Sequence, residues 1–268
     1  MTTIQPRDLD VDFSGVPRHW VAGSAAATAV SNGINLLFPH GERFFVRSVK
    51  HFFDRIEEPE LRAQIKGFFG QEGRHAASHD DLNAVLRVQG FEIDRFLDTY
   101  KRLTDWLEAR TPPKLRLAVT AAAEHFTATL AEGAFKNGVL EACDPRMQQL
   151  LAWHAAEEIE HKHVAYDVLQ KIDPSYALRV AGLIYATVTL AGFWIAATHA
   201  LFKQEGLTWR RAIAQLRALP ARNPVIRRVF GRGIRQYLHR DFHPDQIDNR
   251  GLANAWFAAH GMSLPEAA

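Results

Sequence analysis

Apolar and polar positions along the chain follow the pattern of helices packed on one face, and the breaks between them carry helix-starting signals. Around residue 42, for example, Phe38, Phe45 and Val49 fall on one helical face. Hairpin signals are few. Four breaks offer an N-cap side chain, three of them followed by a proline at the first helical position: Asp144-Pro145, Asp173-Pro174, Asn223-Pro224 and Thr208. The chain is therefore predicted to be almost entirely helical.

The predicted helices are long and are joined by short breaks, such as Gly90 and Thr111-Pro112-Pro113. Their approximate ranges are 38–56, 59–89, 91–110, 112–137, 145–172, 174–205, 208–219 and 224–240, with a short piece near 250–260. Long helices with short connections are typical of antiparallel neighbours in a bundle. The expected fold class is all-α, a helical bundle followed by additional C-terminal helices.

The chain has 268 residues, enough for one large domain or two small ones. It shows no repeat, low-complexity run or linker, so residues 20–250 are expected to form a single helical domain. Within it, a bundle core covers 38–172, an apolar helix 174–205 and a basic helical region 208–240. Residues 1–19 are then an N-terminal arm, and residues 251–268 a C-terminal tail.

One stretch, from Val180 to Ala197, runs for eighteen residues without a charge, which is the lower limit for crossing a bilayer. Tyr185, Thr187 and Thr189 make its centre less apolar than a typical span. A buried central helix, a dimer-forming surface, contact with a membrane surface and a true span all remain open for it.

The segment after this stretch is basic, although the formal net charge of the whole chain is only +2. Between Lys203 and Arg240 there are ten Lys and Arg residues and one acid, Glu205. Such a segment suits an anionic lipid surface or an acidic partner, or is simply a solvated surface. Nucleic acid is not the partner expected here.

Cys143 is the single cysteine, which excludes an internal disulfide framework and a cysteine-rich metal site. Its expected role is that of a small core residue. The N-terminus is polar and shows no signal peptide. The expected location is the cytoplasm, at the inner membrane face if the apolar stretch contacts lipid.

Candidate chemistry concentrates first between residues 153 and 163, in W-H-A-A-E-E-I-E-H-K-H. At 100° per residue, His154, Glu158 and His161 project within about 60° of one another. They form one stripe on the helix. Glu160 and His163 point away from this stripe and are expected on a solvated face, while Glu157 lies at the margin of the stripe.

A second long helix repeats the pattern, because Glu72, His75 and His79 again share one narrow stripe. A single Glu-x-x-His arises often by chance. Two copies on separate long helices, each with a third ligand-type residue in line, favour a metal site.

Two further helices each supply one glutamate on a face that favours burial. Glu42 lies among apolar residues, and Glu124 lies among small ones, Thr120, Ala121 and Thr127. A buried carboxylate is costly unless it is paired or coordinates a cation. The alternatives are that Glu42 pairs with Arg43 or Arg74, and that Glu124 is a surface residue beside His125.

Taken together, the chain offers Glu42, Glu72-x-x-His75, Glu124 and Glu158-x-x-His161, in that order. Four-helix dimetal bundles use one Glu from each of two helices and a Glu-x-x-His from each of the other two. Oxygen-rich ligation with one nitrogen for each metal suits iron or manganese better than structural zinc. Two Fe ions are expected, with Mn or a mixed Mn/Fe pair as alternatives. Glu42, Glu124 and Glu158 are the expected catalytic carboxylates.

This order and spacing resemble the ferritin-like di-iron carboxylate proteins over about residues 38–165. His154, four residues before Glu158, resembles the additional histidine of the arylamine N-oxygenases in that superfamily, whose last motif is His-x-x-x-Glu-x-x-His. The resemblance implies a ferritin-like four-helix bundle and His154 as a seventh ligand. His79 is a candidate eighth ligand, a residue that holds a ligand in place, or a proton donor.

The chain as a whole, including R-Q-Y-L-H-R-D-F-H-P up to Pro244, resembles a family of mainly bacterial proteins described as predicted metal-dependent hydrolases. The ending typical of that family is Tyr-Leu-Arg-Pro-Gly-Phe-His-Pro, from which His239-Arg240-Asp241 departs. His243 in this ending is expected to cap a helix or to serve a structural role.

The leading functional prediction is an oxygen-activating di-iron oxidase or oxygenase that uses O2 as cosubstrate and acts on an apolar small molecule, fatty-acyl or aromatic. The alternative is a dinuclear metal-dependent hydrolase, because two metals can activate a bridging water. Metal storage or a non-catalytic scaffold is a third hypothesis.

The sequence also indicates which residues hold the metal-binding histidines in place and which proteins interact with this chain. Metal-bound imidazoles usually donate their second N–H to a carboxylate, for which Asp80, Asp81 and Glu157 are candidates. The chain carries neither a Gly-x-Gly-x-x-Gly nor a P-loop motif, so electrons are expected from a separate electron-donor protein. A homodimer is a further expectation.

Overall fold

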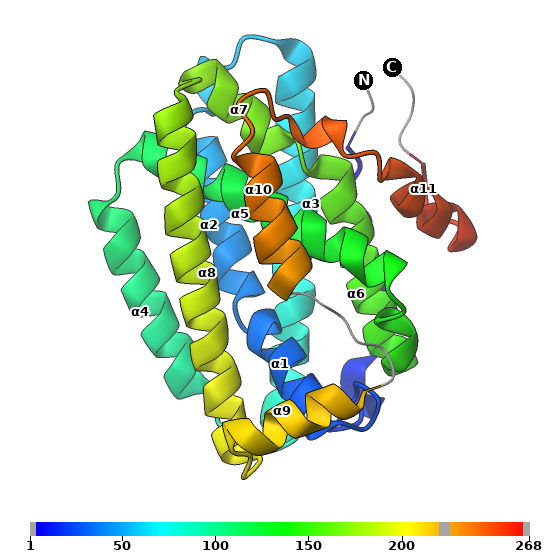
Figure 1. Cartoon of the computed structure of the whole chain (residues 1–268). Coiled ribbons are helices and arrows are strands. Elements are labelled where there is room, and N and C mark those ends of the chain that lie inside the picture. Colours follow the sequence, from blue (N-terminus) through cyan, green and yellow to red (C-terminus); the bar gives the residue numbers. More distant parts are fainter. Residues whose placement is uncertain (1–3, 220–225, 265–268) are drawn as a thin grey trace.

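The computed structural model describes residues 4–219 and 226–264, with the backbone alone at 226–229, and within this part of the chain it contains no β-strand (Figure 1). A single isolated bridge joins Val21 to Cys143. The all-α prediction is therefore confirmed. Cys143 is half-buried against a core that includes Trp20, as expected of a small core residue.

The helices are α1 (Ala25–Asn35), α2 (Phe38–Lys50), α3 (Pro59–Val88), α4 (Asp94–Arg110), α5 (Pro113–Lys136), α6 (Pro145–His161), α7 (Val164–Ile172), α8 (Tyr176–Gln204), α9 (Trp209–Ala218), α10 (Ile234–Tyr237) and α11 (Arg250–Ala259). A π-helical segment, Ile226–Gly233, runs directly into α10. Short 3-10 turns lie at Phe13–Gly15, Phe53–Arg55, Leu140–Ala142 and Pro244–Gln246.

Four helices form the bundle that matters for the site. The helix α2 packs against α3 and α5, and α6 packs against the same two helices, so that each of the four has two neighbours. The helix α8 covers α5 and α1, and α4 lies outside α8 (Figure 1). Close contact of α8 with α5 depends on Gly182, where a Cβ would lie 2.5 Å from the carbonyl oxygen of Ala118.

Two of the three predicted capping signals within the described residues mark a helix start. Asp144 accepts a hydrogen bond from the Arg146 amide, and Thr208 accepts one from the Arg211 amide. Asp173 instead ends α7, and the cap of α8 is Ser175, two residues later. Asn223-Pro224 lies outside the described residues.

Three boundaries differ from the prediction. The sequence analysis missed α1, although Ser24 caps it by accepting from the Ala27 amide. The predicted helix 145–172 is divided at Lys162, whose buried ammonium donates to the Ile247 carbonyl and the Asn249 side chain. The predicted helix 38–56 ends at Lys50 and continues as a 3-10 turn.

The helix α8 is buried on one face only. Leu183 and Ala186 are buried, whereas Ile184, Val188 and Ile195 are 58–66% exposed. Within the described residues one helix, α8, is long and apolar enough to cross a bilayer, judged by length and composition alone. Of the four alternatives, burial on all sides is therefore wrong, and a dimer-forming surface, contact with a membrane surface and a true span stay predictions.

Both ends of the described chain pack against the bundle. Ile4, Phe13 and Val16 of the predicted arm are buried, and α11 contacts α6 through Phe257. The division into arm, domain and tail stays a prediction, but the arm and α11 cover one side of α6.

Candidate metal centre

The four bundle helices bring the predicted ligands together in the interior. The helix α3 carries one stripe and α6 the other, and α2 and α5 each add a glutamate. None of these residues is more than 4% exposed: Glu42, Glu72, His75, His79, Glu124, His154, Glu158 and His161. The alternative that Glu124 is a surface residue is therefore wrong.

One end of the cluster forms around His161. Its Nε2 atom lies 3.1 Å from Glu72 Oε1, 3.2 Å from Glu124 Oε2 and 3.6 Å from Glu158 Oε2. Ligand atoms of Glu72, Glu124 and His161 all lie within 4.8 Å of one another. This is a spacing that one cation could bridge.

The other end forms around His154, about two turns before His161 on α6. Its Nε2 atom lies 2.9 Å from Glu158 Oε1 and 3.6 Å from Glu42 Oε1. His75 Nδ1 lies 3.7 Å from the same Glu158 oxygen. Compact groups here are Glu42, His79 and His154; His75, His154 and Glu158; and Glu42, Glu72 and His75. Glu158 approaches histidines of both ends, so the cluster has the form of two adjacent sites.

Hydrogen bonding leaves these atoms unsatisfied. Among the described residues, both oxygens of Glu42, Glu72 and Glu124 are buried without a hydrogen-bond partner, as are Glu158 Oε2 and His161 Nε2. Buried polar atoms in native proteins nearly always have a partner, and an unpaired buried carboxylate is costly. Bound cations would satisfy all of these atoms at once, so the residues present fit a metal pair.

Ionisation behaviour points the same way. Burial, followed by repulsion from neighbouring carboxylates, raises the pKa of Glu42 and of Glu72 well above the usual range. The same causes raise the pKa of Glu124 to about 7. Burial lowers the pKa of His75 and of His79, which keeps these imidazoles in the neutral form that binds metals. A central cation would lower the carboxyl pKa values again.

Hydrogen bonds on the far side of two imidazoles orient them. His161 Nδ1 lies 2.8 Å from Gln71 Oε1, and His75 Nε2 lies 3.0 Å from Glu157 Oε2. Since both acceptors are oxygens, these ring nitrogens carry protons, and the opposite nitrogens face the carboxylate cluster. Burial lowers the pKa of His161, but the charge of Glu158 and hydrogen bonds to the glutamates outweigh this and raise it, so a bound cation would replace a proton on Nε2. Both imidazoles are therefore oriented to offer their second nitrogen to a cation.

Arg7, from the N-terminal arm, joins these two supports. Its guanidinium donates to Glu157 at 3.2 Å and to Glu160 at 2.8 and 2.9 Å, and its backbone amide also donates to Glu157. The Gln71 side chain donates to the same Glu160. An unbroken chain of contacts thus runs from His75 through Glu157, Arg7, Glu160 and Gln71 to His161.

The comparison with family models matches residues 5–248 to a family described as predicted metal-dependent hydrolase. The match spans most of the chain. The chain belongs to this family. No match was found among the curated proteins or among the solved structures. The family membership agrees with a metal-binding protein, and the buried glutamates and histidines fit a metal site.

Several expectations around the centre were wrong. Glu160 and His163 were predicted on a solvated face, but each is only 3% exposed, because Arg7 of the arm covers Glu160 and Asp245 lies beside His163. Asp80 and Asp81 are exposed and do not lie beside the histidines. Of the predicted supports, Glu157 has the expected contact, with His75.

Other expectations concerned charge pairs and the tail. Arg43 pairs with Asp80 and Arg74 with Asp8, so the described contacts of these arginines do not involve Glu42. His243 caps the turn Pro244–Gln246, which confirms its structural role. Its ring also contacts Asp167 at 2.8 Å.

The sequence analysis missed Arg7 and Gln71. Gln71 lies directly before Glu72, yet nothing in the local pattern marks it as a histidine support. Arg7 is 150 residues from Glu157 along the chain, and no periodic signal connects positions so far apart.

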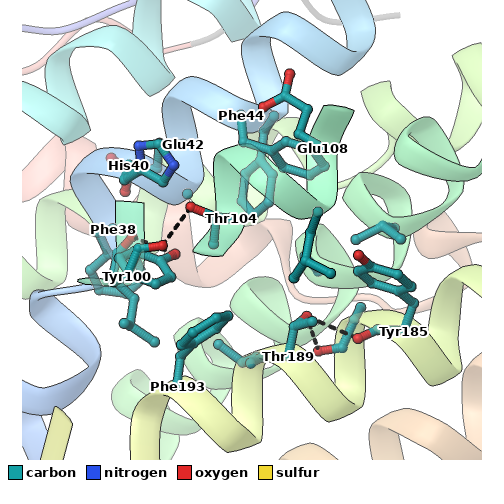
Figure 2. Close-up of a pocket in the computed structure, with 18 of the residues that line it drawn as sticks. Phe38, His40, Glu42, Phe44, Tyr100, Thr104, Glu108, Tyr185, Thr189 and Phe193 are labelled. Carbon is teal, nitrogen blue, oxygen red and sulfur yellow. Dashed lines mark hydrogen bonds between the residues drawn. The ribbon is translucent and has the colours of Figure 1, made fainter. Parts of the chain in front are cut away.

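A mainly apolar cavity of about 120 Å³ adjoins the cluster, between α2, α4, α5 and α8. Glu42 is one of its lining residues, so the cavity reaches the candidate metal centre. Figure 2 shows Phe38 and Tyr100 on one side of the cavity and Tyr185 on the other. The walls are aromatic and aliphatic, which suits a small apolar ligand.

Proposed function

We propose that this protein is a non-haem di-iron oxidoreductase that activates oxygen at the Glu and His cluster and acts on an apolar small molecule. The observation that carries the proposal is the convergence of four buried glutamates, seven of whose eight carboxylate oxygens lack a hydrogen-bond partner among the described residues. The resemblance of their order and spacing to di-iron carboxylate proteins supports iron over other metals.

The ligand set follows from the contacts. Glu72, Glu124 and His161 would hold one ion, and Glu42, His75 and His154 the other, with Glu158 between them. His79 contacts His154 Nδ1 at 2.7 Å, so it orients His154 or joins it as a ligand. When bound, an iron pair supplies electrons for the reduction of dioxygen.

The chain itself supplies the conditions for such chemistry. Burial of every candidate ligand excludes water from the centre, and neutral imidazoles limit the charge that the bundle must accommodate. The cavity beside Glu42 gives an apolar molecule access to the reacting region. We propose that electrons arrive from a separate protein, since the sequence carries no nucleotide-binding motif.

Metal-dependent hydrolysis is the second candidate, and the family description favours it. A metal pair can lower the pKa of a bound water and stabilise a developing oxyanion. This chemistry needs water and a polar scissile group at the centre. The apolar walls and the buried carboxylates are less suited to those needs than to oxygen chemistry.

The decisive test uses protein purified without chelator, with its metal content measured. The protein is reduced without oxygen, mixed with air-saturated buffer and followed by absorption spectroscopy. An oxidase is expected to consume oxygen with a transient visible band that His161→Ala and Glu158→Ala abolish, while Asp80→Ala, on the surface, retains it. Metal-dependent cleavage of esters or amides that is indifferent to oxygen would instead establish the hydrolase.

A further inference from the structure

The apolar cavity has a charged end that the proposed function does not use. Glu108 of α4 and Arg116 of α5 both line the cavity, and their nearest charged atoms lie 3.4 Å apart. Arg47 of α2 reaches the same Glu108 carboxylate at 2.7 Å. Three helices therefore bring two cations and one anion together, and two of these groups, Arg116 and Glu108, line one end of a mainly apolar cavity.

Arg116 has donor capacity left over. Its Nε atom is buried and has no hydrogen-bond partner among the described residues, and its contact with Glu108 is long. The bidentate bond of Glu108 goes to Arg47 instead. A guanidinium that lines an apolar cavity and is not fully paired is suited to bind a carboxylate.

The candidate metal centre adjoins the cavity further along α5. The cavity-lining positions of this helix are Arg116, Val119, Ala123, Thr127 and Leu130, and Arg116 lies roughly 10 Å, at 1.5 Å per residue, from Ala123, the residue before Glu124. On α2, Glu42 lines the same cavity. The distance suits a medium-chain acyl group held between the charged end and the centre.

The volume of the cavity limits which ligands can bind. Its volume is about 120 Å³. Since a cavity of about 150 Å³ accommodates benzene, this space suits a slender chain and not a fused ring system. Phe44, Phe45 and Leu107 provide the apolar walls between the two ends.

We propose that the cavity binds a medium-chain carboxylate, with its carboxylate on Arg116 and its alkyl chain directed along α5 toward Glu42. Binding of this carboxylate depends only on the cavity and does not require the proposed oxidase function. The further statement that the distal end of the chain is the part that reacts rests on the proposed oxidase function.

The test is isothermal titration of the full-length protein, as purified, with octanoate, octanol and octylamine. Octanoate is expected to bind at least about tenfold more tightly than octanol, because a hydrogen bond to a charged group contributes about 1.5–3 kcal/mol. Arg116→Gln should remove this preference and leave octanol binding unchanged. Arg110→Gln, an exposed position at the end of α4, is the matched control and should retain it.

A second variant, Glu108→Gln, tests the proposal even if Arg116→Gln fails to fold. Removal of this anion leaves Arg47 and Arg116 unpaired at the cavity end, so octanoate should bind more tightly. Tighter binding of octylamine than of octanoate would overturn the proposal and make Glu108 the anchor. Equal binding of octanoate and octanol would overturn it as well.

These outcomes separate the ligand from the metal function. Failure to bind octanoate leaves the metal content and oxygen reactivity as they are. Conversely, loss of oxygen reactivity in His161→Ala does not alter a cavity whose charged end lies on α2, α4 and α5.

Discussion

Two groups of buried glutamates in this bundle differ in how their charge is compensated. Glu157 and Glu160, on the outer side of α6, both bind Arg7, so an organic cation lies between them. The inner group, Glu42, Glu72, Glu124 and Glu158, has no Lys or Arg within salt-bridge distance among the described residues, and its nearest cationic candidates are imidazoles. In the outer group, a protein side chain compensates the carboxylate charge. In the inner group, that charge is compensated only when cations are bound.

The comparison also explains why both groups occur together. The outer glutamates do not point at the candidate metal centre, but they orient the imidazoles that do. Glu157 contacts His75 directly, and Glu160 holds Gln71, which in turn contacts His161. The arm residue Arg7 therefore influences a centre that it does not touch.

Removal of metal should give the largest effect. A ligand present at about 1,000 times its Kd stabilises the folded state by about 4 kcal/mol, so chelation should lower the Tm by on the order of 10 °C. Calorimetry before and after chelation, with metal restored as the control, measures this. If the chelated protein melts at the same temperature as the loaded one, the inner glutamates do not depend on a cation.

Arg7→Gln should destabilise the fold almost as much. It removes the cation from a buried group and leaves Glu157 and Glu160 without their counter-charge, a loss of about 3–5 kcal/mol in the free energy of unfolding. Urea denaturation measures it. Arg43→Gln, which breaks an exposed pair with Asp80, is the matched control and should cost less than about 1 kcal/mol. Similar losses in the two variants would refute the special role of Arg7.

Gln71→Met should affect metal binding more than stability. It keeps the side-chain volume but removes the oxygen that accepts from His161 Nδ1, so the ring loses its fixed tautomer. Removal of such a support typically lowers metal affinity about 10–100-fold. Competition with a coloured chelator measures the affinity. An unchanged affinity would mean that packing against Phe68 alone orients the His161 ring.

Much of this centre was predictable from the sequence because it lies on regular helices. The period of an α-helix fixes which residues of one helix share a face, so the stripes of Glu72 and of Glu158 could be assigned without coordinates. The helical period gives no information on which other segment of the chain covers a given face of a helix. Glu160 was therefore wrongly placed in solvent, because the arm that buries it lies more than 150 residues earlier.

Element boundaries show the same limit. The caps at Asp144 and Thr208 act locally, and the sequence signals for them were sufficient. The break of the predicted helix 145–172 at Lys162 depends on acceptors at Ile247 and Asn249, which only the folded chain brings near. Local signals were not always read correctly, since the cap of α1 at Ser24 was missed and Asp173 was taken for the cap of α8, but features fixed by distant segments left no local signal to read.

The smallest expected effect belongs to Asp80→Asn. This variant tests whether Asp80, next to His79 in the α3 sequence H-D-D, takes part in metal binding. Asp80 directly follows His79, but its side chain points to solvent and pairs with Arg43, about half-exposed like Asp80 itself. The variant should lose less than about 1 kcal/mol of stability and should keep full metal content, measured by elemental analysis. Loss of metal in this variant would mean that the carboxylate reaches the histidines in solution, and the outer support of the centre would then extend beyond Glu157 and Gln71.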